Sequence, residues 1–385
     1  MKALIAIVYL SLSGFTGLLG MDVNIMRTPH SGIQPQVKVD ATGNIHLVYY
    51  VGEPSAGDLF YVTCGSTDAL WSEPIRINNT PNAAVAGGTI RGAHMSVGKE
   101  NRIHVSWFGS AQVSPKPPEG SYSQAPLMVT RMTDNRKGFE PERNVMTWTK
   151  NLDGGGSIAA DQKGNVYVAW HGRGDSIIEG EMGRGIFLAI SKDQGKTFNK
   201  EIEIKEAPQG SCACCGMRIL AHPAGQLHIV YRGIQGKIRP MIDLWSTDGG
   251  RTFLKTVFNP WEIEACPMSS VTLLPHNKQL LIATEQEGTI RLNHKPLDKS
   301  SLNSFSNQQQ SWKGKHPSMA TDPNGNVLLT WAEGAGWAKG GTLRWVIMNK
   351  SGKVVAKSPS ENQLEIPVWS FPSALHLQEE FQVIY

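Results

Sequence analysis

Seven segments of the chain share one alternating pattern of apolar and polar positions. Each segment contains a short strand of small residues, a polar turn that often includes Gly-Asn, and a β-branched strand that ends in an aromatic or acidic residue. Alternation with a period of two is typical of half-buried strands. The pattern therefore predicts a repeated β-hairpin at 36–50, 94–108, 157–171, 217–232, 269–285, 318–333 and 373–385.

The spacing of these segments predicts a β-propeller. Successive segments start between 49 residues (269 to 318) and 63 residues (94 to 157) apart, which is the spacing of propeller blades. A further apolar strand follows six of the seven, and a turn and a fourth strand usually follow that. We predict an all-β propeller of seven blades, the last completed by residues near 22–28. A six-bladed ring with a spare hairpin is the alternative.

Two turns carry a sharper motif. "SKDQGKTF" (191–198) and "STDGGRTF" (246–253) both fit Ser-x-Asp-x-Gly-x-Thr-Phe, and "STDALW" (66–71) and "MTDNRKGF" (132–139) look like weaker copies. The aspartate can accept hydrogen bonds from the turn backbone, and the glycine can take a positive φ. These motifs are Asp boxes, and through them the chain resembles the sialidase superfamily of BNR/Asp-box propellers. The resemblance implies that the boxes are structural and lie on the face opposite the ligand site.

The net charge bears on the partners of the protein, and the N-terminal segment bears on its location. The formal net charge is only +4, with no Lys/Arg block that could track phosphates, so nucleic acid is not an expected partner. Residues 1–20 have Lys2, an apolar run and then small residues, which predicts a secretory signal peptide; an uncleaved anchor is the alternative. We expect one propeller domain over 21–385, secreted or periplasmic, monomeric, with no membrane span after cleavage.

The sialidase resemblance implies a carbohydrate ligand, and an acidic sugar in particular. Arg27, Arg232 and Arg291 match the positions of the arginines that bind the substrate carboxylate, for which planar two-point donors are suited. Asp58 matches the position of the catalytic acid, with Glu53 in reserve. The alternatives are salt bridges for the arginines and a loop cap for Asp58.

The chain also departs from the sialidase pattern. The family nucleophile is a Tyr paired with a Glu, but "CACCGMR" (212–218) stands where the Glu is expected, and the loop "WAEGAGWAKGG" (331–341) has no Tyr. The resemblance implies a glycoside hydrolase of the exo-sialidase type if the protein is an enzyme. A carbohydrate-binding propeller without catalysis and a structural or interaction propeller stay open.

Other candidate residues lie where first strands begin or second strands end, because both points face the ligand side of a propeller. The loop 172–185 overhangs this side, and its candidate rim groups are Asp175, Glu179, Glu181 and Arg184; solvated loop charges are the alternative. The candidate ligand-binding residues are His94, Asp153, His171, Arg173 and Trp369.

The cysteines allow two main interpretations. Cys212, Cys214 and Cys215 precede the fourth hairpin, and Cys266 precedes the fifth at nearly the same offset. An oxidising compartment permits a disulfide between blades, such as Cys215–Cys266. Alternatively, these four cysteines with Met268 and His316 form a soft ligand set for Cu or Zn. A redox-active thiol is a third interpretation, and the sequence points to no other cofactor.

Overall fold

The computed structural model describes residues 23–65, 70–88, 91–113, 125–208, 210–297, 303–304, 311–361 and 363–385. The predicted signal peptide at 1–20 and part of the weak motif at 66–71 lie outside these residues. Within the described ranges, no helix has the length and hydropathy needed to cross a membrane.

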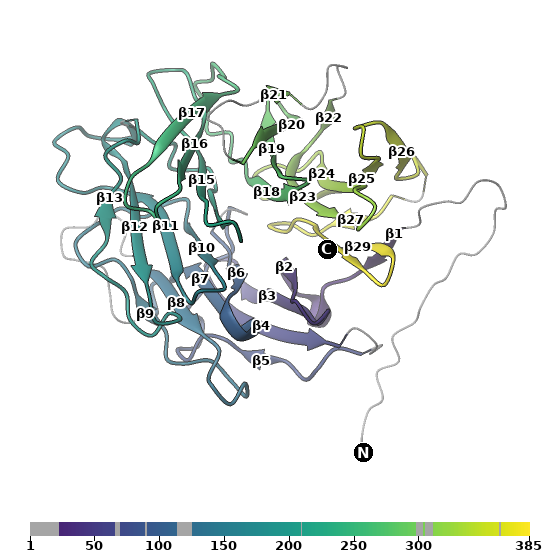
Figure 1. The fold of residues 1–385 in the computed structure, drawn as a ribbon, viewed down its shortest axis with the longest axis horizontal. Coiled ribbons are helices and arrows are strands. Elements are labelled where there is room, and N and C mark those ends of the chain that lie inside the picture. Colours follow the sequence, from purple (N-terminus) through teal and green to yellow (C-terminus); the bar gives the residue numbers. More distant parts are fainter. Residues whose placement is uncertain are drawn as a thin grey trace.

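Seven sheets are arranged around a central axis (Figure 1), and the strands pair antiparallel in all of them except at one pairing in the seventh. In each sheet the first strand lies nearest the axis, and Figure 1 shows β2, β6, β10, β18 and β23 around the centre. Blades 1 to 4 have four strands each, in chain order. They are β2 (Ile33–Val39), β3 (Ile45–Glu53), β4 (Ala56–Cys64), β5 (Ile75–Arg76); β6 (His94–Val97), β7 (Ile103–Phe108), β8 (Leu127–Arg131), β9 (Arg143–Asn144); β10 (Gly156–Ala160), β11 (Val166–Gly172), β12 (Gly185–Ser191), β13 (Ile202–Glu203); and β14 (Arg218–Ala221), β15 (Leu227–Arg232), β16 (Met241–Ser246), β17 (Leu254–Phe258).

Blades 5 and 6 each have three inner strands in the same order as blades 1 to 4. In each of them, two short strands pair with the third strand at the outer edge. Blade 5 contains β18 (Val271–His276), β19 (Gln279–Gln286), β20 (Thr289–Pro296), β21 (Asn303–Ser304) and β22 (Trp312–Lys313). Blade 6 contains β23 (Lys315–Thr321), β24 (Val327–Glu333), β25 (Gly341–Met348), β26 (Val354–Lys357) and β27 (Glu365–Ile366).

Blade 7 closes the ring with both ends of the propeller. It consists of β28 (Ser373–Leu377), β29 (Glu380–Ile384) and β1 (Val23–Met26), and β1 pairs with β29 in parallel. The Thr28 N–H and hydroxyl both donate to the Tyr385 carbonyl at 2.8 Å. Seven blades and closure by the N-terminal segment are thus confirmed, and the six-bladed alternative is wrong.

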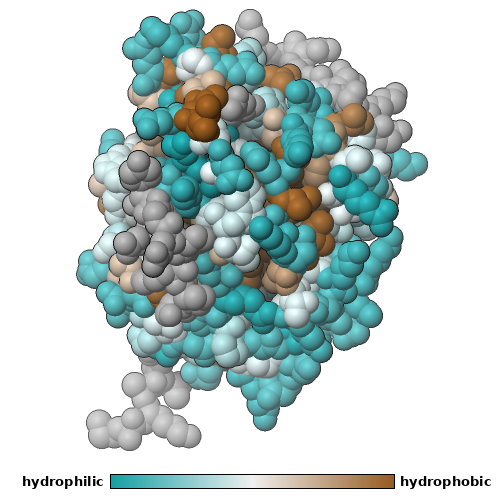
Figure 2. All heavy atoms as spheres, turned by 90° about the vertical axis from the view of Figure 1, so that its left-hand side faces the viewer, coloured by the Kyte–Doolittle hydropathy of each residue, from teal (hydrophilic) through white to brown (hydrophobic). Residues whose placement is uncertain are grey.

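The apolar core consists of one cluster between each pair of neighbouring blades. A second strand is apolar on both faces because it serves two clusters. In β3, Leu47 and Tyr49 pack toward blade 7, whereas Val48 and Tyr50 pack toward blade 2. The outer wall on the side of blades 3 and 4 is mostly hydrophilic with separate apolar groups (Figure 2). Leu254 on β17 is one exposed apolar residue of blade 4.

The two complete Asp boxes join third and fourth strands as expected. In the first, the Ser191 hydroxyl donates to Asp193 at 2.7 Å, and Asp193 accepts from the backbone and side chain of Thr197. Asp248 makes the matching bonds with Ser246 and Thr252. These turns lie at the opposite end of the blades from the loops that precede first strands.

Candidate functional site

A cavity of about 970 Å³ opens where the loops before the first strands meet those after the second strands. It is the mouth cavity of the propeller. Loops from all seven blades reach it, from Pro54 and Ser55 in blade 1 to Trp369 before blade 7. The hairpin topology therefore gathers residues distant in sequence at one end of the ring.

Two indoles form the aromatic part of the mouth cavity. Trp337, in the loop after β24, meets Trp369 edge to face with ring centroids 4.8 Å apart. Trp337 is 62% exposed, and Trp369 has a left-handed backbone with φ of 65°. The Trp369 carbonyl accepts a hydrogen bond from Gln34 Nε2 at 2.7 Å, which holds this strained turn in place. An exposed aromatic face suits stacking on a sugar ring or another flat apolar group.

Three arginines line the same cavity, and they differ in how many of their guanidinium nitrogens donate hydrogen bonds to protein acceptors. Arg91 donates to the Asp153 carboxylate at 2.5 Å and to the Asp153 and Gly87 carbonyls, so its charge is paired. Arg173 uses Nη2 alone, to bond the carbonyls of Ser176 and Ile178. Two further arginine nitrogens, Nη1 and Nε of Arg173, thus have no protein acceptor among the described residues.

Arg184 is the second arginine with free donors. Its Nη1 donates to the Asn151 carbonyl at 2.5 Å, and its other nitrogens bond no described residue. Burial lowers the pKa of Arg184, and the charge of Arg173 lowers it further, whereas Asp153 and Glu181 raise it. Arg173 and Arg184 therefore present guanidinium N–H groups to the cavity at sites where an anionic group would relieve their repulsion.

Carboxylates also line the mouth cavity, but most are committed to the fold. Glu181 accepts from the Ala213 N–H at 2.7 Å and from Arg239 Nη1 at 2.9 Å, so it anchors the loop 172–185 to blade 4. Asp153 is paired with Arg91. Glu179 also lines the cavity.

The structure places Arg27, Arg232 and Arg291 apart from one another and outside the mouth cavity. Arg27 is exposed and lies over the Tyr385 ring, 4.8 Å from its centroid, in the closure of blade 7. Arg232 is 2% exposed and donates to the carbonyls of Arg239 and Glu285. Arg291 is exposed on β20. No carboxylate-binding triad forms from these three.

Asp58 lies on β4 and caps a loop. Its Oδ1 accepts from Asn78 Nδ2 at 2.6 Å and from the Asn82 N–H at 2.8 Å. It does not line the mouth cavity, and neither does Glu53. Asp153, Arg173 and Trp369 do line it. His94 and His316 line the axial channel instead, and His171 is buried beneath the cysteines, with Nε2 3.3 Å from the Cys215 carbonyl oxygen.

Cys212, Cys214 and Cys215 form a triangle of buried sulfurs beside the mouth cavity. Their Sγ atoms all lie within 4.8 Å of one another, with Cys212 Sγ 3.5 Å from Cys214 Sγ and 3.4 Å from Cys215 Sγ. Only Cys214 of the three lines the cavity. We call these residues the thiol triangle.

Cys266 does not join the thiol triangle. Neither Cys215 nor Cys266 forms a disulfide; Cys266 is exposed and lines the mouth cavity, whereas Cys215 is 2% exposed. The structure therefore lacks the Cys215–Cys266 disulfide. Met268 packs against the triangle, whereas His316 lies in the axial channel and bonds Ser270.

Two arginines surround the thiol triangle. Arg239 Nη1 lies 3.1 Å from Cys212 Sγ, and the Arg232 charge acts on Cys215. Burial raises the pKa of Cys215, but hydrogen bonds from Cys212 and Cys214 and the Arg232 charge lower it well below its usual value. Hydrogen bonds to Cys212 and Cys215 raise the pKa of Cys214. Of the three thiols, Cys215 is the one whose environment favours the thiolate, and thiolates are metal ligands and nucleophiles.

Some site residues carry a weak signal in the sequence. Arg91 precedes β6 in the segment "RGAHMS", yet only its contact with Asp153 across blades shows its position in the cavity. Trp337 lies in the loop 331–341, which the sequence comparison with sialidases singles out only for its lack of a Tyr. Of the four candidate rim groups in the loop 172–185, Glu179, Glu181 and Arg184 line the cavity, whereas Asp175 does not.

Solved structures that superpose on the chain include a sialidase, an α-L-arabinanase and a trans-sialidase. A Hadza microbial sialidase superposes with a TM-score of 0.54 at 14% identity, covering 86% of this chain and 74% of that one. An α-L-arabinanase of Penicillium chrysogenum in complex with arabinobiose gives 0.54 at 14% identity, covering 86% and 96%. A leech intramolecular trans-sialidase gives 0.50 at 8% identity, covering 92% and 86%.

No protein-family model and no curated protein sequence matches the chain. At 8–14% identity, the structural likenesses show the fold and leave the activity to be inferred from the site. The seven blades agree with these superpositions. The chain therefore has the β-propeller fold that these sialidases and arabinanases share, with seven blades in this protein.

Proposed function

We propose that the mouth cavity binds an acidic carbohydrate and that the protein is an extracytoplasmic glycan-binding propeller. One observation carries the proposal: the Trp337–Trp369 pair and the free guanidinium donors of Arg173 and Arg184 line one cavity of about 970 Å³. A sugar ring can stack on an indole while its carboxylate accepts from a guanidinium. The structural neighbours named as sialidase and arabinanase support a sugar as the ligand class.

The site favours binding over sialidase chemistry. Hydrolysis with retention needs a nucleophile and an acid that flank the scissile bond. Asp58 caps a loop outside the cavity, and Tyr385 is 9% exposed in the closure of blade 7. The described carboxylates that line the cavity are Asp153, Glu179 and Glu181, and any hydrolysis there would have to use them.

Isothermal titration of the mature protein with three ligand types tests this function. We expect binding of N-acetylneuraminic acid or uronic-acid oligosaccharides and weaker binding of neutral arabino-oligosaccharides. Trp369→Ala and Arg184→Gln should each weaken binding about tenfold or more, whereas Arg291→Gln, an exposed arginine outside the cavity, should leave it unchanged. Product analysis with the same ligands reports any cleavage. Absence of binding to all three types, or equal loss in Arg291→Gln, would overturn the proposal.

The thiol triangle supports a second function, the binding of a soft metal ion. A metal at about 2.3 Å from three sulfurs requires S···S separations of about 3.8–4.0 Å. The observed separations of 3.4 and 3.5 Å, within a group that spans 4.8 Å, reach these values by shifts of a few tenths of an ångström. Three thiolates without a fixed fourth ligand suit Cu(I) better than Zn(II). Arg239 and Arg232 offset the thiolate charge.

Competition between the protein and a Cu(I) chelator tests the metal function. We expect one Cu(I) per chain, with ultraviolet thiolate-to-copper absorption, and loss of both in Cys212→Ser or Cys215→Ser. Cys64→Ser is the matched control because Cys64 lies on β4, away from the triangle. A thiol count that shows a disulfide among Cys212, Cys214 and Cys215 in the protein as purified, with no bound metal, would contradict this function.

A further inference from the structure

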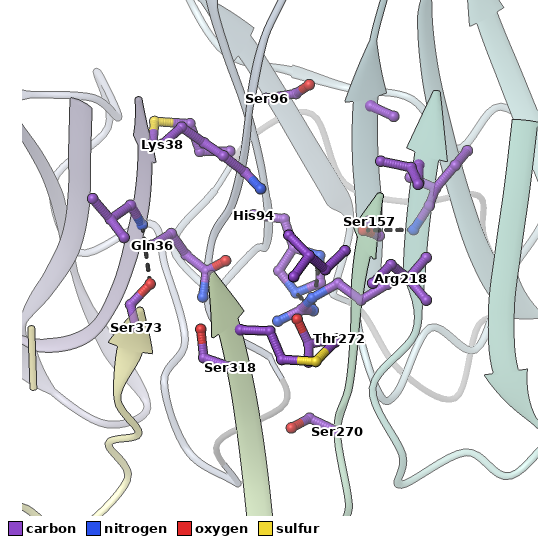
Figure 3. Close-up of a pocket in the computed structure, with 18 of the residues that line it drawn as sticks. Gln36, Lys38, His94, Ser96, Ser157, Arg218, Ser270, Thr272, Ser318 and Ser373 are labelled. Carbon is purple, nitrogen blue, oxygen red and sulfur yellow. Dashed lines mark hydrogen bonds between the residues drawn. The ribbon is translucent and has the colours of Figure 1, made fainter. Parts of the chain in front are cut away.

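An axial channel of about 210 Å³ runs between the inner strands of the seven blades. Figure 3 shows its walls, which are formed by first strands from opposite sides of the ring. The volume is more than tenfold the roughly 10–15 Å³ that one water needs, so a small hydrated ion fits. The channel is separate from the mouth cavity, because no residue lines both.

Serine side chains tie neighbouring inner strands together around the channel. In each case the hydroxyl oxygen accepts a hydrogen bond from a backbone N–H of the next blade, a group that the strand edge would otherwise leave unpaired. The four bonds are Ala160 N to Ser96 Oγ (2.8 Å), Ile219 N to Ser157 Oγ (3.2 Å), Ala374 N to Ser318 Oγ (3.0 Å) and Val37 N to Ser373 Oγ (3.3 Å). We call these four residues the serine ring.

The serine ring has hydrogen-bond donors to spare. A hydroxyl has one hydrogen and two lone pairs, and here a lone pair serves the neighbouring strand. No described residue accepts the hydroxyl hydrogen of Ser96, Ser157, Ser318 or Ser373. These hydrogens are therefore available to a channel occupant that accepts hydrogen bonds.

Two cations reach into the same channel from opposite walls. Lys38 comes from β2 of blade 1 and Arg218 from β14 of blade 4, and Figure 3 shows both side chains directed into the space between the blades. Of the described residues that line the channel, none is Asp or Glu. Neither cation has an ion-pair partner in the described part of the chain; Arg218 Nη1 contacts only His94 and the Met217 carbonyl.

The pKa values of the basic groups in the channel are lowered, which agrees with an excess of positive charge there. Lys38 is exposed to the open space of the channel, yet the protein atoms around it lower its pKa by desolvation, and the Arg218 charge adds to the effect. Burial lowers the pKa of Arg218 to about 10. Burial and the charges of Lys315 and Arg218 lower the pKa of His316 to about 3, so this imidazole stays neutral. Two cations that face one space without a counter-charge repel each other, and an anion between them would relieve this repulsion.

We propose that the axial channel binds a small oxyanion, phosphate or sulfate, between Lys38 and Arg218. The guanidinium fork matches two oxygens of a tetrahedral anion, the ammonium serves as a point charge, and the serine ring supplies hydroxyl donors for the remaining oxygens. The anion links blade 1 to blade 4 across the axis. Its binding stabilises the folded ring according to its concentration, since the unfolded chain lacks the site.

Thermal unfolding in oxyanion-free buffer and in rising phosphate or sulfate, each at ionic strength matched with sodium chloride, tests this proposal. We expect the unfolding temperature of the mature protein to rise with oxyanion above the chloride control. The effect of Lys38→Met on stability should change sign when oxyanion is added. Without oxyanion the variant should be as stable as the parent or more so, because an uncompensated cation is gone, and in saturating phosphate it should be less stable than the parent.

Direct binding gives a second readout that does not depend on a variant's stability. Phosphorus-31 relaxation of phosphate with the parent protein should show binding that Lys38→Met and Arg218→Met each weaken about tenfold or more, and Arg291→Met should leave it unchanged. Trp369→Ala should also leave it unchanged, which separates this site from the mouth cavity. Chloride as effective as phosphate at equal ionic strength, or phosphate binding unaffected by Lys38→Met, would overturn the proposal.

Discussion

Arg232 Nη2 donates a hydrogen bond to Ser269 Oγ at 3.1 Å and so joins blade 4 to blade 5 from inside the protein. The same guanidinium bonds the carbonyls of Arg239 and Glu285 and stacks over Trp261, 5.2 Å from the ring centroid. The sialidase resemblance implies that Arg232 binds ligand, but in this structure its side chain links two neighbouring blades.

Replacement of Arg232 should therefore affect stability before it affects binding. We expect Arg232→Met to lower the free energy of unfolding by about 3 kcal/mol, because two buried carbonyls lose their donors. Denaturant titration measures the loss, and Arg291→Met should stay within about 0.5 kcal/mol of the parent. Glycan affinity of the folded fraction should not change; a fall in affinity at full folding would assign Arg232 to the ligand site.

A fully buried ion pair in blades 4 and 5 allows a double-mutant test. Lys295 Nζ lies 2.7 Å from Asp243 Oδ2, neither side chain is exposed, and His228 Nδ1 lies 3.1 Å from Asp243 Oδ1. Lys295→Met should cost about 3–5 kcal/mol because it leaves Asp243 buried without its cation. Lys295→Met combined with Asp243→Leu should recover most of that loss. Additive losses in the double variant, read from denaturant curves, would contradict the pairing.

His104 gives the protein an acid-sensitive point in blade 2. Burial lowers its pKa to about 3, with the charges of Arg102 and Arg131 adding to the effect, and its Nε2 has no partner among the described residues. The unfolded chain takes up this proton near pH 6.5 and the folded chain only near pH 3. Stability therefore falls as the pH is lowered from 6.5 toward 3, by up to about 1.4 kcal/mol per pH unit for this group.

The slope of the free energy of unfolding between pH 4 and 6 measures this contribution. In His104→Leu we expect the slope to decrease by about one proton equivalent, because the residue no longer titrates in the unfolded chain. Other buried histidines keep their share of the slope. An unchanged slope in His104→Leu would show that His104 is protonated in the folded protein.

Thiol reactivity should divide the cysteines by their positions. Cys266 is exposed, whereas the members of the thiol triangle are 1–8% exposed. A disulfide reagent should modify Cys266 fastest in the native protein, and Cys266→Ser should remove the fast phase, while all five thiols react in denaturant. Fast reaction of three thiols in Cys266→Ser would show that the triangle opens to solvent.

The fold could be predicted because the blades repeat one short-range pattern. Alternation in segments such as 36–50 specifies two-sided strands, and Asp193 and Asp248 mark the turns through bonds within a few residues. The segment 373–385 has only two predicted strands, so closure of its blade by residues near 22–28 could also be predicted. These features depend on local sequence, which one chain supplies.

The site was harder to predict because its contacts cross blades. Arg91 and Asp153 stand 62 positions apart, and only the length and course of two loops bring them together. Lys38 alternates with apolar neighbours as a solvent-facing residue does, so a position that faces the axis looks the same in sequence as one that faces water. The thiol triangle was visible as a cluster, but whether Cys266 joined it depended on a loop conformation.

The parallel pairing of β1 with β29 also dictates the order of assembly. Val23 and Phe381 are partners 358 positions apart (381 − 23), so the ring closes only when residues 373–385 are available. Until then a growing chain carries two unpaired apolar flanks, the sides of blades 1 and 6 that blade 7 will cover. Contacts of such long range form slowly, and the exposed flanks are prone to association meanwhile. A chaperone that binds exposed apolar surface would therefore protect the chain most before residues 373–385 pair with β1.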